Sequence, residues 1–153
     1  MDSSHRFDGM KVLVVDDNVD YVDTLSVLLE LMGCKTFVAY DGRTALQLFH
    51  HARPDIVFLD LDMPGLDGCD AALLVQAEDI AGHTLLACVT GRSEPADEER
   101  CRRAGFDFFF PKPLEEHQLI EALDAALRRR QAPAWPRNPP PPEADTGRWS
   151  RHS

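Results

Sequence analysis

The sequence predicts an α/β fold in which helices cover both faces of a doubly wound, five-stranded parallel sheet. Five short apolar runs are spread along the chain, and each is followed by a segment in which apolar residues recur at helical spacing. The apolar runs are nearly continuous, as in strands buried on both faces, and do not alternate with polar residues. With 153 residues, 44% of them hydrophobic, the chain is near the size of one domain. Strands and helices in alternation imply right-handed crossovers between parallel strands.

The first predicted strand is the apolar run Lys11–Val15, which ends in two carboxylates, Asp16 and Asp17. A helix is predicted from Val19 to Met32, because its apolar residues return every three or four positions. The residues of this apolar stripe are Val22, Leu25, Leu29 and Met32. The residues expected to bound the helix are Asn18 or Asp20 at its start and Gly33 at its end.

The next three elements are a strand, a helix and a third strand. The strand is predicted over Lys35–Tyr40, and the helix, entered at Asp41-Gly42, stops before Pro54, because the residue before a proline is pushed out of the α region. The apolar run that opens at Asp55 then ends at Asp60, at the edge of the sheet where ligands bind in open α/β folds. Aspartate is also common in turns, so residue type alone leaves both a chemical and a capping role open for Asp60.

Two more pairs of strand and helix complete the pattern. Acidic residues and a proline mark the start of the fourth helix, and three arginines mark the end of the fifth. In both places the charges complement the helix dipole. The predicted elements are a helix over Cys69–Glu78, a strand over Thr84–Val89 that ends at Thr90, a helix from about Glu94 to Gly105, a strand over Phe106–Phe110 and a last helix that ends at Arg130.

The folded domain is predicted over residues 10–130. Residues 1–9 are expected to be a polar N-terminal extension that lacks the apolar core of a signal peptide, and no apolar run reaches the length of a membrane span. Residues 131–153 are rich in proline and poor in aliphatic side chains, which predicts a disordered Pro-rich tail. These features predict a cytoplasmic protein.

Charge and cysteine content narrow the expected partners. A formal net charge of -10 argues against a nucleic-acid or anionic membrane surface, so proteins or small phosphorylated molecules are expected. The cysteines are widely separated and form no C-x-x-C pair. Isolated thiols in the core are therefore expected, and neither disulfides nor a zinc site. The four cysteines are Cys34, Cys69, Cys88 and Cys101.

Polar side chains follow four of the predicted strands. Asp16 and Asp17 follow the first strand and Asp60 the third, while Thr90 ends the fourth and Lys112 comes just after the fifth. In a doubly wound sheet of order 2-1-3-4-5, the flavodoxin-like order, the first and third strands are neighbours. This order would bring Asp17 and Asp60 close together.

Such a cluster suits phosphoryl transfer. Carboxylates in one crevice repel one another, and a hard divalent cation such as Mg2+ relieves the repulsion through carboxylate oxygens and water. Lys112 adds a positive charge and Thr90 a hydroxyl donor for the oxygens of a phosphoryl group in transit. Asp60 is then the expected nucleophile, which would form an aspartyl phosphate.

Four motifs occur in the order and at the gaps found in the receiver domains of bacterial two-component response regulators. They are Val-Asp-Asp at 15–17, Leu-Asp-Leu-Asp-Met-Pro-Gly-Leu-Asp-Gly at 59–68, Val-Thr-Gly at 89–91 and Phe-Phe-Pro-Lys-Pro at 109–113. Each motif alone is weak, but the combination is specific. Over about residues 10–130 the chain therefore resembles a receiver domain, which implies the (βα)5 receiver fold.

The resemblance implies a role for each matching residue. Asp60 would accept a phosphoryl group from the phosphohistidine of a sensor histidine kinase or a histidine phosphotransfer protein. Lys112 would pair with Asp60 and then with the phosphoryl group, and the Lys112-Pro113 peptide bond would be cis. The Mg2+ ligands would be Asp17, Asp60, the backbone carbonyl of Asp62 and, mostly through water, Asp16.

The resemblance also implies a conformational switch. Thr90 would swing toward the phosphoryl group as Phe109 turns inward, and Phe109 lacks the hydroxyl of the commoner tyrosine. Gly91 would leave the phosphoryl site open. The variable positions that tune the lifetime of the phosphorylated state would be Asp62 and Arg92.

Two hypotheses of different classes follow. The first is a signalling switch, not an enzyme, in which phosphorylation of Asp60 alters a protein-binding surface formed by the last two helices and the fifth strand. The second is an enzyme, because the segment 59–63 also resembles the Asp-x-Asp motif of Mg2+-dependent phosphatases of the haloacid dehalogenase type. In those enzymes the motif comes first and the acidic pair last, whereas here the acidic pair comes first.

No output domain is predicted after Arg130, because neither a second apolar periodicity nor a basic recognition helix follows. The expected protein is a single-domain response regulator that acts on a downstream protein and on neither nucleic acid nor a membrane. A receiver detached from a hybrid histidine kinase is the alternative. Dimerisation on phosphorylation is left open.

Overall fold

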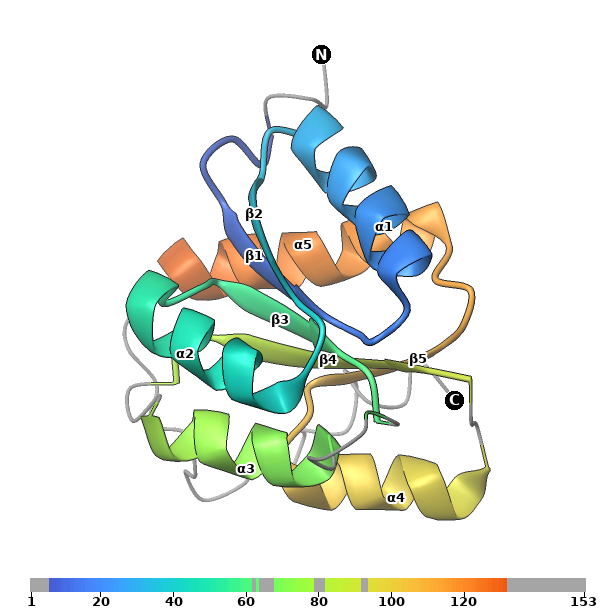
Figure 1. Ribbon diagram of the computed structural model, residues 1–153. Coiled ribbons are helices and arrows are strands. Elements are labelled where there is room, and N and C mark those ends of the chain that lie inside the picture. Colours follow the sequence, from blue (N-terminus) through green and yellow to red (C-terminus); the bar gives the residue numbers. More distant parts are fainter. Residues whose placement is uncertain (1–5, 62, 64–67, 79–81, 92–93, 132–153) are drawn as a thin grey trace.

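The structure, a computed structural model, describes residues 6–61, 63, 68–78, 82–91 and 94–131. Within these ranges five strands and five helices alternate along the chain, as predicted (Figure 1). The strands are β1 (Lys11–Val15), β2 (Lys35–Ala39), β3 (Ile56–Leu59), β4 (Leu85–Thr90) and β5 (Phe108–Pro111). The helices are α1 (Val19–Leu31), α2 (Gly42–Ala52), α3 (Gly68–Glu78), α4 (Pro95–Ala104) and α5 (Glu116–Gln131).

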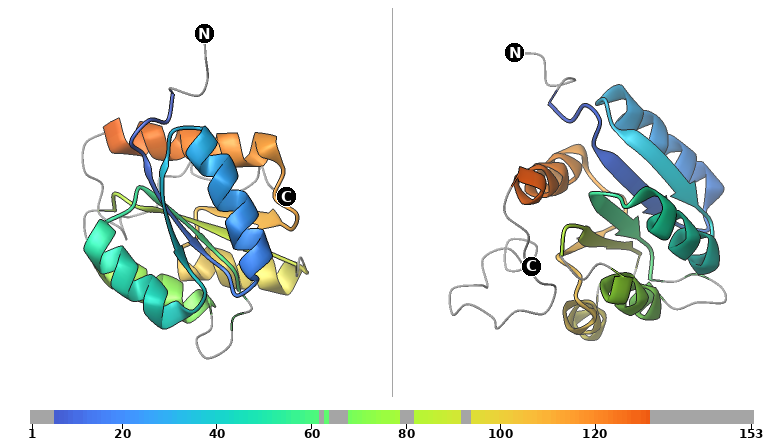
Figure 2. Two further views of the ribbon diagram at one scale, coloured as in Figure 1. Left: turned by 45° about the horizontal axis from the view of Figure 1, so that its top comes forward. Right: turned by 90° about the vertical axis from the view of Figure 1, so that its left-hand side faces the viewer.

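The five strands are parallel and lie in the order β2-β1-β3-β4-β5, which confirms the predicted topology. Helices α1 and α5 cover one face of the sheet, and α2, α3 and α4 cover the other (Figures 1 and 2). Successive residues of a strand point to opposite faces. In β1, for example, Val12 and Val14 pack with α1 and α5, whereas Leu13 and Val15 pack in the core of the other face. Burial on both faces explains why β1, β3 and β4 are nearly continuous apolar runs, whereas the edge strand β2 is only partly buried.

Phenylalanines contribute large side chains to the hydrophobic cores on both faces of the sheet. Phe108 and Phe110 of β5 stack with their ring centroids 5.4 Å apart on the face covered by α1 and α5. Phe49 of α2 is fully buried in the cluster on the opposite face. Burial of each such side chain contributes about 1.5–3 kcal/mol to folding.

Side-chain caps begin the first two helices. The side chain of Asn18 accepts a hydrogen bond from the N–H of Tyr21 at 3.1 Å and caps α1, in agreement with the prediction. Asp41 caps α2 in the same way, with the N–H of Thr44 at 2.8 Å. Hydrogen bonds from the backbone and side chain of Thr44 hold the pKa of Asp41 below its usual range.

The predicted start of the last strand at Phe106 was wrong by two residues. The N–H of Phe106 donates to the carbonyl of Cys101 at 3.1 Å, so this residue completes the end of α4. Asp107 then exchanges two hydrogen bonds with Leu86, one from its own N–H and one to its carboxylate. Because a side chain replaces the backbone carbonyl in this pair, the regular strand begins only at Phe108. The other predicted boundaries lie within one or two residues of the observed ones.

All four cysteines are buried thiols, as predicted. The expectation that they are isolated was wrong for one pair, since the Sγ atoms of Cys88 in β4 and Cys101 in α4 lie 3.5 Å apart. The two meet because α4 covers the face of the sheet toward which Cys88 points. Burial, together with the contact to Cys101, raises the pKa of Cys88, and burial beside acidic groups raises the pKa of Cys34 to about 11.

The N-terminal segment packs against the domain from Phe7 onward. Phe7 is buried in the core between α1 and α5, the guanidinium of Arg6 lies over its ring, and Arg6 also forms an ion pair with Asp124 of α5. Residues 1–5 and, apart from Gln131, the predicted tail at 131–153 lie outside the described residues. In the described part of the chain no helix has both the length and the apolar character needed to cross a membrane.

Candidate functional site

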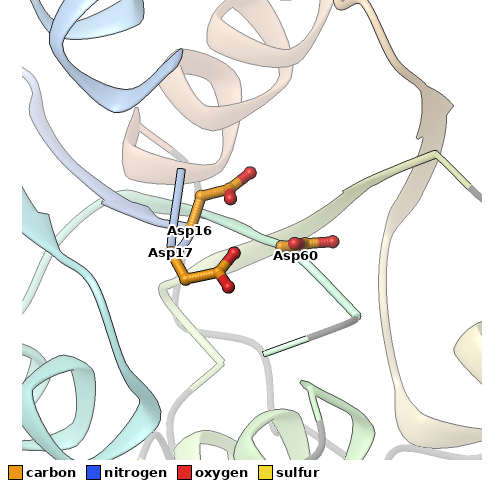
Figure 3. A group of neighbouring side chains, drawn as sticks. All are labelled: Asp16, Asp17 and Asp60. Atoms are coloured by element: carbon orange, nitrogen blue, oxygen red, sulfur yellow. The ribbon is translucent and has the colours of Figure 1, made fainter. Parts of the chain in front are cut away.

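The carboxyl ends of β1 and β3 bring carboxylates together. Val15 and Leu59, the last residues of these neighbouring strands, are paired in the sheet. The N–H of Asp60 donates to the carbonyl of Val15 at 3.0 Å, which continues the pairing one residue further. Asp16, Asp17 and Asp60 therefore gather at one edge of the sheet (Figure 3). This is the proximity predicted from the strand order.

The three carboxylates form a compact acidic cluster. One oxygen from each of Asp16, Asp17 and Asp60 lies within 4.8 Å of the other two. Asp16 and Asp60 are only 2% and 5% exposed, whereas Asp17 is exposed to solvent. Three negative charges at this separation repel one another. Because Mg2+ binds carboxylate oxygens and retains several waters, this partly exposed set of hard oxygen donors fits it.

Lys112 supplies a positive charge to the cluster. Its Nζ lies 2.6 Å from Oδ2 of Asp16 and 3.7 Å from Oδ2 of Asp60. The nearer partner is thus Asp16, whereas the resemblance implied Asp60. Burial alone would lower the pKa of Lys112, but the hydrogen bond to Asp16 and the charges of the neighbouring carboxylates raise it above its usual value. The ammonium group therefore stays charged at neutral pH.

The carboxylate of Asp16 is held from two sides. The backbone N–H of Asn18 donates to its Oδ1 at 2.9 Å, and Lys112 contacts its Oδ2. Charge-assisted contacts to both oxygens satisfy this nearly buried carboxylate and restrict its rotation. Since Asn18 also caps α1, the start of that helix and the orientation of Asp16 depend on the same residue.

The remaining predicted site residues lie on the neighbouring strand ends. Thr90, the last residue of β4, is fully buried, and its carbonyl accepts the N–H of Lys112 at 2.9 Å. Gly91 follows it, and a Cβ at that position would have no other atom within 4 Å. Phe109 pairs with Cys88 in the sheet and is buried in the core beneath α2, α3 and α4. In this structure the ring of Phe109 therefore points inward.

Two positions implied by the resemblance, Asp62 and Arg92, lie outside the described residues. The Lys112-Pro113 peptide bond is cis, as the resemblance implied.

Sequence reasoning missed one residue beside the cluster, Tyr21. Its ring centroid lies 4.8 Å from Nζ of Lys112. Burial, followed by the charges of Asp16 and Asp60, raises the pKa of Tyr21, so its hydroxyl is neutral. The available signal was its place in the first turn of the helix that follows Asp16 and Asp17, a turn that begins beside the ends of the strands.

Known proteins are similar to this chain in sequence and in fold. The family model described as the response regulator receiver domain matches residues 12–124. The chain is 31% identical to Protein PilG of Pseudomonas aeruginosa over 118 residues, which cover 77% of this chain and 87% of PilG. It is 32% identical to the DNA-binding response regulator MtrA of Mycolicibacterium paratuberculosis over 119 residues, 78% of this chain and 52% of MtrA.

A third similarity is to a much longer protein. The chain is 32% identical to the Virulence sensor protein BvgS of Bordetella bronchiseptica over 141 residues, 89% of this chain but 11% of BvgS. It thus spans about half of one of these relatives and about a tenth of another.

Solved structures agree with the topology. A CheY-like response regulator receiver domain protein from Methanospirillum hungatei superposes with a TM-score of 0.74 at 20% identity, covering 80% of this chain and 97% of that one. At this identity the likeness shows the fold alone. Chemotaxis protein CheY4 of Vibrio cholerae superposes with a TM-score of 0.72 at 26% identity, covering 77% of this chain and 98% of that one.

Proposed function

Since this chain belongs to the family of response regulator receiver domains, we propose that it is a single-domain response regulator that is phosphorylated on Asp60. The observation that carries the proposal is the site at the ends of β1 and β3. There Asp60 lies 3.7 Å from the ammonium of Lys112 and beside two further carboxylates. As a receiver domain the chain is a phosphoacceptor module of two-component signalling.

In the proposed reaction a carboxylate oxygen of Asp60 attacks the phosphorus of a phosphohistidine on a histidine kinase or phosphotransfer protein. A phosphorus–oxygen bond forms as the phosphorus–nitrogen bond breaks, and the electron pair of the broken bond returns to the imidazole. The ammonium of Lys112 lies beside Asp60 and balances the negative charge on the phosphoryl oxygens. Water later hydrolyses the aspartyl phosphate and releases inorganic phosphate.

The residues proposed to hold Mg2+ are Asp16, Asp17 and Asp60, with the backbone carbonyl of Asp62 added on the strength of the resemblance. The cation would neutralise charge on the phosphoryl oxygens. Asp16 keeps its orientation through Asn18 and Lys112, so it offers a fixed carboxylate at the base of the site.

We propose that the phosphoryl group signals through Thr90 and Phe109 to the surface formed by α4, β5 and α5. Thr90 is adjacent to Pro111 in the sheet, and Phe109 is two residues away on the same strand. A movement of Thr90 toward Asp60 would therefore directly displace residues of β5. A switch of this kind needs a differential stabilisation of only a few kcal/mol between two conformations.

The proposed partners are a histidine kinase or a histidine phosphotransfer protein upstream and a protein target downstream. The net charge of -10 favours a protein target over nucleic acid. Four cysteines that remain thiols support a cytoplasmic location, where disulfides are rare. Similarity to a segment of a sensor protein supports the alternative that the receiver comes from a hybrid histidine kinase. Dimerisation on phosphorylation is a further expectation.

The proposal is tested by incubating the protein with Mg2+ and acetyl phosphate and measuring intact mass and free phosphate together. The expected result is one phosphoryl adduct in the wild type and none in Asp60→Asn. Asp23→Asn, an exposed change of the same kind on α1, serves as the matched control and should form the adduct like the wild type.

Two outcomes would overturn the proposal. An adduct that persists in Asp60→Asn would place the phosphoryl group elsewhere. Steady hydrolysis of unrelated phosphoesters such as p-nitrophenyl phosphate, abolished by Asp60→Asn, would indicate a phosphatase of the haloacid dehalogenase type and not a signalling switch.

A further inference from the structure

The ammonium of Lys112 has a third neighbour besides the two carboxylates. Its Nζ lies 4.8 Å from the ring centroid of Tyr21, within the range of a cation–π interaction. The side chain of Lys112 is 25% exposed, so one side of it remains open to solvent. The carboxylates of Asp16 and Asp60 and the face of the Tyr21 ring therefore share the same ammonium group.

Tyr21 is well placed to restrict Lys112. It lies in the first turn of α1, where its N–H is bonded to the capping side chain of Asn18, and its ring packs against the core between α1 and α5. A long lysine side chain loses conformational freedom when it is held in one place, and a fixed aromatic face opposes its escape into solvent. The ring thus comes from a rigid element.

The hydroxyl of Tyr21 makes no comparable contribution. It is buried, and among the described residues it has no hydrogen-bond partner. Removal of a buried hydroxyl that lacks a partner costs little, because no bond is lost and no partner group is left unsatisfied. Any effect of Tyr21 on the site should therefore depend on the aromatic ring.

We propose that Tyr21 is a positioning residue, whose ring holds the ammonium of Lys112 between Asp16 and Asp60 so that it meets the incoming phosphoryl group. This inference rests on the proposed phosphorylation of Asp60. Tyr21 positions Lys112 through its aromatic ring. Unlike Lys112, Tyr21 does not itself touch the phosphoryl group. A phenylalanine at position 21 keeps the ring face, whereas a leucine removes it.

The test compares Tyr21→Phe and Tyr21→Leu in the full chain. The rate of phosphorylation by acetyl phosphate with Mg2+ is measured by intact mass over a range of donor concentrations. Tyr21→Phe should match the wild type, and Tyr21→Leu should be slower by about fivefold, which corresponds to about 1 kcal/mol of lost cation–π interaction. Urea unfolding monitors the fold, and Tyr21→Met is a second variant without a ring if Tyr21→Leu is not folded.

NMR supplies a readout that does not depend on the reaction. Protons on the terminal carbon of Lys112 that lie over an aromatic face are shifted upfield, so this shift should persist in Tyr21→Phe and disappear in the variants without a ring. The inference is overturned if these signals do not move, if Tyr21→Leu reacts like the wild type, or if Tyr21→Phe is as slow as Tyr21→Leu. If the wild type itself takes up no phosphoryl group, the proposed function fails, and the NMR comparison still decides the contact.

Discussion

Asp60→Asn should stabilise the protein in the absence of divalent cations. The substitution keeps the size of the side chain and removes one negative charge from the acidic cluster. Whether the substitution stabilises or destabilises the protein depends on two opposing effects. The repulsion of Asp60 by Asp16 and Asp17 is relieved, and the attraction of Asp60 to Lys112 is lost.

The distances in the site give the magnitudes of the repulsive and attractive electrostatic energies of Asp60. At 4.8 Å, the upper limit of the separations between these carboxylate oxygens, and an effective dielectric constant of about 20, each of the two repulsions is about 3.5 kcal/mol. The attraction between Asp60 and Lys112 across 3.7 Å is about 4.5 kcal/mol on the same scale. The repulsions exceed the attraction by about 2 to 3 kcal/mol. Asp60→Asn should therefore raise the free energy of unfolding by about that amount.

Urea unfolding in EDTA measures the stability of each protein without the cation, and urea unfolding in Mg2+ measures the stability that each protein gains from it. Without Mg2+ the variant should be the more stable protein. With Mg2+ at ten times its dissociation constant the wild type should gain about 1.4 kcal/mol, and the variant should gain less because it has lost one of the proposed ligands. The exposed change Asp23→Asn should alter neither the free energy of unfolding in EDTA nor the gain from Mg2+ appreciably. A variant less stable than the wild type in EDTA, or an equal gain from Mg2+ in both proteins, would refute the reasoning.

Four further predictions concern the scaffold. The pKa of Asp41 is lowered by its bonds to Thr44, so the stability lost in Asp41→Ala should be constant at neutral pH and shrink as the pH falls below about 4, measured by urea unfolding at several pH values. Gly105→Ala should lower the free energy of unfolding by about 1 to 2 kcal/mol, because φ is 94° there, a left-handed conformation that residues with a Cβ rarely adopt. Gly91→Ala, where a Cβ meets open space, should change it by less than about 0.5 kcal/mol in the same assay. Phe110→Ala should cost about 3–5 kcal/mol in chemical denaturation, because Phe110 is fully buried.

The parts of the structure that follow from local pattern were predictable. Continuous apolar runs marked the strands, and alternation with helices implied the parallel order that sets Asp60 beside Asp16. In such a sheet the neighbours of a strand end are determined by topology, so the acidic cluster could be expected before any side chain was placed.

What could not be predicted depends on how helices lie on the sheet. The contact of Cys88 with Cys101 requires the position of α4, and the contact of Tyr21 with Lys112 requires the angle at which α1 leaves β1. Neither contact can be recognised from the periodicity of hydrophobic residues along the sequence. The late start of β5 escaped prediction for another reason, since Asp107 uses its side chain where a backbone carbonyl was expected.

The burial of all four thiols has a practical consequence for spectroscopy. The cysteines should react slowly with bulky labels in the native state, because they are buried and the pKa values of Cys34 and Cys88 are raised. A single cysteine introduced on the exposed side of α4 or α5 would then be the preferred target of a fluorophore or spin label, with the native four left in place. Such a probe would test in real time whether that surface undergoes the proposed rearrangement as a phosphoryl group is added and removed.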